Sequence, residues 1–274
     1  MDCPLVNRTE EAVDVEFASL VASAVETAGS PIDDYYEHTR ALLAPSLRAF
    51  PDPDPVLLQA LFLGVVSAAE FFYRDLLSRL IRICPLAQKA ASPRTLSLGA
   101  VSYCGQRLGL GILESTSFAD PAAIRQWTKT ILGLELKDES SVSSALEDFG
   151  RACQIRHAAT HSRGHLGEQN ARILELESNT LQVLNLDTIG FQQLLAICHN
   201  AVRAYNRYVF EGIVQRWIDK GVLRGDWAHD KTSWTSLFCV TYSLVDSPGT
   251  RVAYHAWRQI KAHAASSARA QGFA

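Results

Sequence analysis

The sequence lacks the features that mark several large classes of protein. Its six cysteines are scattered and contain no C-x-x-C pair, so we expect reduced, mostly buried thiols rather than a disulfide framework. The first residues are acidic and polar, without the basic start and apolar run of a secretory signal. The chain also contains no internal repeat and no low-complexity tract.

Positive charge is also scarce. The net charge is −3 at pH 7, so bulk charge does not predict a nucleic-acid coat, and any RNA binding must come from a local patch. The most apolar stretch, residues 56–72, is interrupted by Gln59 and Glu70 and is too short to span a bilayer comfortably. We therefore expect a soluble, cytoplasmic protein without a membrane partner.

Apolar residues recur at helical spacing through most of the chain, of which 47% is hydrophobic. The spacing predicts an all-α fold with helices over residues 15–25, 31–50, 56–83, 99–113, 121–132, 141–161, 187–220, 231–245 and 248–266. We divide the chain into N-terminal helices (1–50), a core domain (51–225) and a small C-terminal helical accessory segment (226–274).

One segment departs from helical spacing. Residues 172–177 and 181–186 alternate between apolar and polar side chains, with Ser178-Asn179 between them. Alternation around a short turn is typical of a β-hairpin. The sequence therefore predicts a short hairpin after the helix that ends at residue 161.

Positive charge gathers in residues 151–172, which hold four arginines against one acid, Glu168. The arginines are Arg151, Arg156, Arg163 and Arg172, and the same segment contains His157, His161 and His165. A local excess of this size can hold one or two phosphates.

This combination suits RNA cleavage, because RNA carries its own nucleophile, the 2′-OH. An enzyme then needs a group that moves protons and a cation that stabilises the charge-rich phosphorane. Histidine titrates near neutrality, and arginine binds two phosphate oxygens through its fork. Arg156 and His161 offer both groups near a helix end. Five residues turn a regular helix by roughly 140°, so the arginine must reach round the helix or the helix must loosen.

The motif Arg156-His157-Ala-Ala-Thr-His161 resembles the signature of HEPN domains: Arg, a polar residue, three further residues, then His. Residues 69–77 resemble the long early helix of such domains, and the likeness covers roughly residues 50–220. It implies a HEPN-like helical bundle that dimerises so that two motifs face one RNA cleft. It also implies metal-independent cleavage that leaves a 2′,3′-cyclic phosphate, and, in prokaryotes, a toxin or a phage-defence nuclease.

The resemblance assigns roles to the residues of the motif. His161 is the expected proton-transfer residue, Arg156 the transition-state stabiliser, and His157 a second catalytic candidate or only the polar spacer. The candidate substrate-binding residues are Arg163, His165 and Arg151. In one branch of the family a Tyr that a nucleotidyltransferase modifies stands where this chain has Arg163, so that regulation is not expected here.

Structural interpretations of the same residues stay open. His161 can simply bond a backbone carbonyl at the helix end, and Arg156 can form a salt bridge to the preceding acidic helix. Glu70 can orient Arg156 or His161 from behind the site, or pair with Arg74 four residues on. The tryptophan-rich C-terminal segment suits packing or an interface better than base stacking.

A metal site is the remaining alternative. Cys153, His157, His161 and His165 lie at steps of four, which lines one helix face with ligands if the helix continues through all of them. Gly164 argues against that continuation, so we expect no metal and no cofactor.

The function expected from these observations is a metal-independent endoribonuclease that works as a homodimer on RNA. An antitoxin or a defence-system protein is a candidate partner. The alternative is a non-catalytic HEPN-like module that binds RNA or serves as an adaptor in a defence complex.

Overall fold

The computed structural model describes residues 12–25, 27–177, 180–248 and 252–270. These residues are 70% helix and 2% strand, which confirms an all-α fold. In chain order the elements are η1 (Phe17–Leu20), α1 (Pro31–Ala49), α2 (Pro55–Ile83), α3 (Pro85–Ala91), α4 (Leu98–Cys104), α5 (Leu108–Leu113), α6 (Pro121–Trp127), the π-helical η2 (Thr128–Leu132), α7 (Ser141–His161), β1 (His165–Leu166), α8 (Glu168–Ile173), β2 (Gln182–Val183), α9 (Thr188–Asp219), α10 (Trp227–Thr241) and α11 (Ala253–Ala270).

Local capping signals explain where the long helices begin. α1 starts after Ser30, whose side chain accepts the backbone N–H of Asp33, and α2 starts after Asp54, whose side chain accepts that of Leu57. Both helices have a proline in the first helical position, where the missing N–H costs nothing. α9 starts after Asp187, which accepts the N–H of Gly190.

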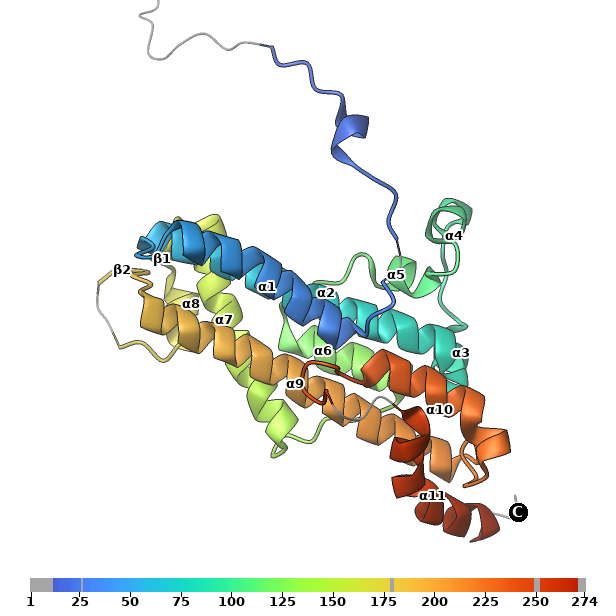
Figure 1. Cartoon of the computed structure of the whole chain (residues 1–274). Helices are drawn as coiled ribbons and strands as arrows, with labels where there is room; N and C mark the ends of the chain where they lie inside the picture. Colours follow the sequence, from blue (N-terminus) through green and yellow to red (C-terminus); the bar gives the residue numbers. More distant parts are fainter. Residues whose placement is uncertain (1–11, 26, 178–179, 249–251, 271–274) are drawn as a thin grey trace, which may run out of the picture.

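α2 is the central helix of the bundle. It packs against α1, α7, α9 and α10, and Figure 1 shows α1 and α9 running along it. Its side chains are buried turn after turn, with Phe62, Val65, Ala69, Leu76 and Leu80 fully covered. This agrees with a helix whose first half is apolar almost all round.

By length and composition alone, α2 could also cross a membrane, because an 18-residue window in it has a mean hydropathy of 1.8. Half of that window is buried inside the fold. The helix is longer than the 56–72 stretch that we judged too short to span a bilayer, so the absence of a membrane partner stays a prediction.

One hydrophobic core contains side chains from all three ranges into which the sequence was divided. Tyr35 of α1, Phe72 of α2, Trp217 of α9, Trp234 of α10 and Trp257 of α11 are each at most 2% exposed and belong to the same cluster. α10 packs on α2 and α9, and α11 packs on α9 and α10. The division of the chain into separate units at residues 50 and 225 stays a prediction.

The expected N-terminal helix over 15–25 is wrong. Within 12–25 only Phe17–Leu20 is helical, as a single 3-10 turn. The side chains of Phe17, Leu20 and Val21 are 69–77% exposed, and Figure 1 shows the segment leading away from the bundle. An apolar stripe makes a stable helix mainly where another surface buries it, and none does so here.

Two further expectations are corrected. The predicted helix 99–113 is two helices, because Gly105 adopts a φ of 53° between α4 and α5. α10 begins at Trp227 rather than near 231, because Asp226 caps it by accepting the backbone N–H of His229.

The predicted β-hairpin is only partly present. The expected strand 172–177 is wrong: α8 (Glu168–Ile173) covers its first two residues, and residues 174–177 form a turn and irregular chain. The expected strand 181–186 shortens to Gln182–Val183, which pairs antiparallel with His165–Leu166. The expected turn at Ser178–Asn179 lies outside the described residues. Alternation over so few residues does not distinguish a strand from a short helix.

Candidate functional site

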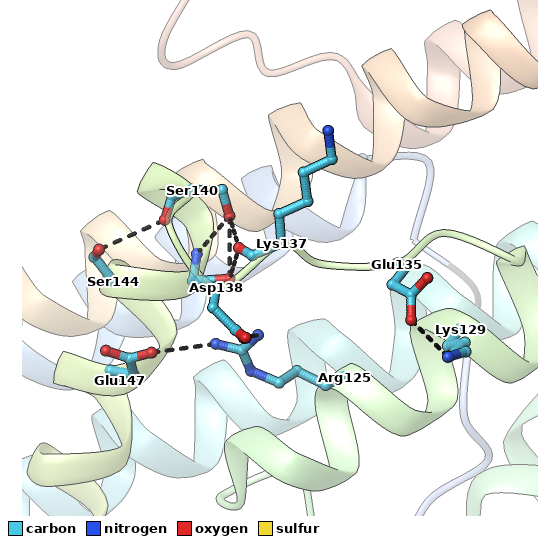
Figure 2. Close-up of polar contacts among 9 residues, drawn as sticks. Arg125, Lys129, Glu135, Lys137, Asp138, Ser140, Ser144 and Glu147 are labelled. Carbon is cyan, nitrogen blue, oxygen red and sulfur yellow. Dashed lines mark hydrogen bonds and ion pairs between the residues drawn. The ribbon is translucent and has the colours of Figure 1, made fainter.

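The segment that carries the predicted site is α7, and its start is held by a serine cap. Ser140 accepts the backbone N–H of Ser143 at 3.3 Å. The hydroxyls of Ser140 and Ser143 both donate to the carbonyl oxygen of Lys137, at 2.6 and 2.7 Å, as Figure 2 shows for Ser140. The turn before α7 is therefore tied to its first turn.

Ion pairs also connect the segment before α7 to α6 and η2. Arg125 of α6 lies 3.5 Å from Asp138 in the turn and 3.3 Å from Glu147 in the second turn of α7, and Figure 2 shows these three side chains. Lys129 and Glu135 pair at 2.6 Å. These carboxylates are exposed, so each pair contributes little stability, and the buried face of α7 against α2 and α9 does more to place it.

α7 ends at His161 in a turn with two residues in the left-handed region. Ser162 and Gly164 both donate their backbone N–H to the carbonyl oxygen of Ala158, at 3.1 and 3.0 Å. Arg163 has a φ of 49° and Gly164 a φ of 84°. Glycine adopts this conformation readily, whereas for arginine it is uncommon and costs free energy.

His157 and His161 form an exposed imidazole pair on the last turn of α7. Their ring centroids are 4.7 Å apart and their planes are inclined by 48°. Both side chains belong to exposed residues. They share a face because residues four apart on a helix are neighbours.

Arg156 points toward the bundle and meets Glu70 of α2. A guanidinium nitrogen lies 3.6 Å from a carboxylate oxygen of Glu70; the Arg156 side chain is 34% exposed and that of Glu70 is 14% exposed. The other carboxylate oxygen accepts the hydroxyl of Ser117 at 3.3 Å. Arg74, the alternative partner of Glu70, instead donates to the carbonyl oxygen of Thr116.

Arg156 and His161 are not brought together within this chain. Among the described residues, no hydrogen bond or ion pair joins the two side chains. They leave the helix about 140° apart. The loosening of the helix end that would have brought them closer does not occur, because α7 stays helical through His161.

Two of the other arginines are neutralised by acids. Arg151 lies 3.5 Å from Asp148 and 3.4 Å from Glu175, and Arg172 pairs with Glu168. All of these side chains are at least half exposed. The local positive excess inferred from residues 151–172 therefore overstates the charge available to a phosphate.

Arg163 is the cation of this segment that stays available. It is exposed and, among the residues that the structure describes, it has no ion pair or hydrogen bond through its side chain. His165 is less available, because its Nδ1 lies 2.8 Å from the carbonyl oxygen of Ser162. The end of α7 thus presents two imidazoles and one unpaired guanidinium.

The four residues of the metal-binding alternative do not all lie on one helix. His165 lies in β1, beyond the end of α7, and Cys153 is buried, where desolvation raises the pKa of its thiol. Within the described part of the chain, no three His, Cys, Asp or Glu side chains are grouped to hold a metal ion.

Comparison of the chain with protein-family models, curated proteins and solved structures finds no match. The site is therefore interpreted from its own geometry. Ser117 was not predicted from sequence; it lies 47 residues from Glu70 along the chain, and nothing in the local pattern links the two.

Proposed function

We propose that this protein is a metal-independent endoribonuclease whose site is the C-terminal end of α7. The observation that supports the proposal is the pair of exposed imidazoles of His157 and His161, 4.7 Å apart, directly before the unpaired Arg163. Two proton-transferring groups beside a cation are what cleavage of RNA through its 2′-OH requires.

The reaction needs two proton transfers. One imidazole removes the proton of the 2′-OH as its oxygen attacks phosphorus. The bond from phosphorus to the 5′-oxygen breaks, and the leaving oxygen receives a proton from an imidazolium. The products are a 2′,3′-cyclic phosphate and a free 5′-OH. His161 lies nearest the free end of the helix and is the first candidate for the base, with His157 as its partner.

Arg163 and Arg156 have different roles in stabilising the negative charge of the phosphate. Arg163 is free to bind the phosphate that flanks or carries the cleaved bond. Arg156 is turned toward α2 and held by Glu70, so it contributes to the transition state only if RNA draws its guanidinium away from that carboxylate. Glu70 is then a positioning residue, because it contacts Arg156 and not the substrate.

A homodimer remains part of the proposal, because a second copy would add a second set of imidazoles and guanidiniums along one RNA strand. An antitoxin or a defence-system protein is the kind of partner that would restrain such an activity. Velocity sedimentation checks the dimer directly: we expect a species of twice the 30.1 kDa chain mass.

The central test is cleavage of a fluorescently labelled single-stranded RNA by the purified chain in the presence of EDTA. His161→Ala should lower the cleavage rate by about 10²- to 10⁴-fold, the range for loss of a general acid or base. The matched control is His263→Ala, which removes another exposed histidine from α11 and should leave the rate unchanged. Equal rates for His161→Ala and wild type would contradict the proposal.

Three further variants test the roles of the two arginines. Arg163→Gln should weaken cleavage more than Arg156→Gln if the unpaired guanidinium binds the phosphate. Glu70→Gln should change the rate of wild type but not that of Arg156→Gln, because its effect passes through Arg156. The opposite order of the two arginine variants would restore Arg156 as the main cation.

A non-catalytic role is the second candidate, and the Arg156–Glu70 ion pair favours it, because a paired guanidinium is a weaker catalyst. An RNA-binding or adaptor module would bind labelled RNA without cutting it. In that case Arg163→Gln should reduce affinity, whereas His161→Ala should have little effect. Binding without cleavage by wild type would select this candidate.

A further inference from the structure

The segment that leads away from the bundle before α1 carries an apolar stripe that nothing in the described part of the chain covers. We call residues 12–25 the N-terminal arm. Four of its apolar side chains are 69–80% exposed: Val13, Phe17, Leu20 and Val21. Steps of three and four place these side chains on one face of a helix. Only one 3-10 turn is formed, so the arm has the pattern of a helix without the partner surface that would stabilise one.

The charge of the arm is negative. Residues 12–25 contain Asp14 and Glu16 and no Lys or Arg, and the first 27 residues of the sequence contain six acids and one base. Negative charge is repelled by anionic lipid headgroups and by the phosphates of RNA. The surface that binds the arm must therefore be apolar and basic, as a protein surface can be.

This chain has a surface of that kind on α4. None of the residues of α4 is buried, the helix packs on α5, and Figure 1 shows it standing out from the bundle. Its large apolar side chains are exposed by 82% at Leu98, 39% at Val101 and 93% at Tyr103. Apolar side chains that gather on a surface in this way commonly mark an interaction site.

The chain around α4 is basic. Residues 76–113 contain five arginines and lysines and no Asp or Glu. Arg107, which follows α4, interacts electrostatically with Asp75 of α2. Arg94, which precedes α4, stacks on the ring of Trp127 at 4.8 Å and has no ion pair among the residues described. The surface of α4 and Arg94 therefore complements the arm in both hydrophobicity and charge.

The arm and α4 belong to the same end of the molecule. Val25, at the base of the arm, lines the same pocket as Arg107. The base is held to α2, because Arg79 donates to the carbonyl oxygen of Gly29 at 2.6 Å. Beyond it the chain is extended, with φ −125° and ψ 151° at Val21, and the arm leads away from its own bundle (Figure 1). Two copies that meet at this end can therefore exchange arms around a two-fold axis.

We propose that the N-terminal arm docks as an amphipathic helix on α4 of a second copy of this chain, and that a reciprocal exchange of arms forms a two-fold dimer. The apolar stripe of the arm packs on Leu98 and Val101 of the second copy, and the acids of the arm face Arg94. The inference does not rest on RNA cleavage, because a chain that cuts no RNA would dimerise in the same way.

The test is sedimentation velocity of the full chain over a range of concentrations. We expect a dimer with a Kd of about 10 µM, so the chain is mostly monomeric at the roughly 1 µM used for fluorescence-detected unfolding. Leu20→Ser in the arm and Leu98→Ser on α4 should each weaken the dimer at least about tenfold. The matched control is Val56→Ser, which changes a 74% exposed side chain in the first turn of α2 and should dimerise like wild type.

Two further measurements separate arm exchange from a dimer formed through another surface. Arg94→Glu should weaken the dimer, and Asp14→Lys/Glu16→Lys in the same chain should restore it, because the charges are then exchanged. Helical content from circular dichroism should rise with concentration in wild type and stay constant in Leu20→Ser, because the arm folds only when it docks. A monomer at about 200 µM, which is also the result if each arm docks on its own chain, or a dimer that Leu20→Ser leaves intact, would overturn the proposal.

Discussion

At the scale of single residues, the fold decides which charged groups remain available. The motif predicts Arg156 as the transition-state stabiliser, but Glu70 of α2 pairs with its guanidinium from another helix. Arg163, expected only to contact substrate, follows His161 by two residues and has no ion pair among the part of the chain that the structure describes. Its position in the left-handed region adds a local strain of the kind often found at functional sites. The sequence shows the type of each residue, but which charged side chains are free to bind a substrate depends on contacts between distant parts of the chain.

His199 allows a prediction of pH-dependent stability. It is half-buried and packs against the rings of Tyr35 and Tyr36. Burial lowers its pKa, with the nearby Arg203 acting in the same direction and Asp246 opposing. The unfolded state, with an ordinary pKa of about 6.5, therefore binds the proton more readily than the folded state. This contribution to stability is present above that pKa and is lost as pH falls below it.

The measurement is urea unfolding of wild type and His199→Gln between about pH 5 and pH 7.5. The free energy of unfolding of wild type should decrease more steeply toward acid than that of the variant. Parallel pH profiles of the two proteins would show that the histidine is equally protonated in both states.

At the scale of elements, the bounds of four long capped helices were predicted well, whereas the start of α10, capped by Asp226, was not. Elements that depend on a partner surface were also not predicted. The predicted bounds 31–50, 56–83, 141–161 and 187–220 agree closely with α1, α2, α7 and α9, because serine, aspartate and proline act within a few residues of a helix start. The apolar stripe over 15–25 had the spacing of a helix, but no surface buries it.

The cap of α7 is a testable example. Ser140→Ala removes the acceptor for the Ser143 N–H and the bond to the Lys137 carbonyl. We expect the free energy of unfolding to fall by about 1 kcal/mol. The matched control is Ser144→Ala, because that exposed hydroxyl makes only a 3.5 Å contact with the Ser140 carbonyl and its loss should cost less than about 0.5 kcal/mol. Equal losses would show that the cap is not formed in solution.

At the scale of the whole molecule, a single core joins the chain from α1 to α11. α10 and α11, expected from sequence to form an accessory segment, bury Trp234 and Trp257 in that core. Trp234 donates to the carbonyl oxygen of Ala253 at the start of α11. Asp230 is fully buried and accepts the indole N–H of Trp257 at 3.0 Å. The contacts that bind the C-terminal helices to each other are therefore part of the main core.

This arrangement predicts cooperative unfolding. Trp234→Ala should lower the free energy of unfolding by about 3–5 kcal/mol, the usual cost of emptying a buried aromatic site. Phe17→Ala, which shortens a side chain that is 77% exposed, should change it by less than about 0.5 kcal/mol. Urea curves followed by tryptophan fluorescence and by far-UV circular dichroism should coincide. A separate early transition in fluorescence would instead show that residues 226–274 unfold on their own.

The amino-acid sequence by itself determined the helical class, the bounds of the capped helices and the position of the motif at the C-terminal end of one of them. These features follow from signals that act within one or two helical turns. Only the tertiary structure decided that Glu70 holds Arg156 and that, among the described residues, the Arg163 side chain has no ion pair. Each of these depends on side chains far apart in the chain, whose contacts and burial no local pattern encodes.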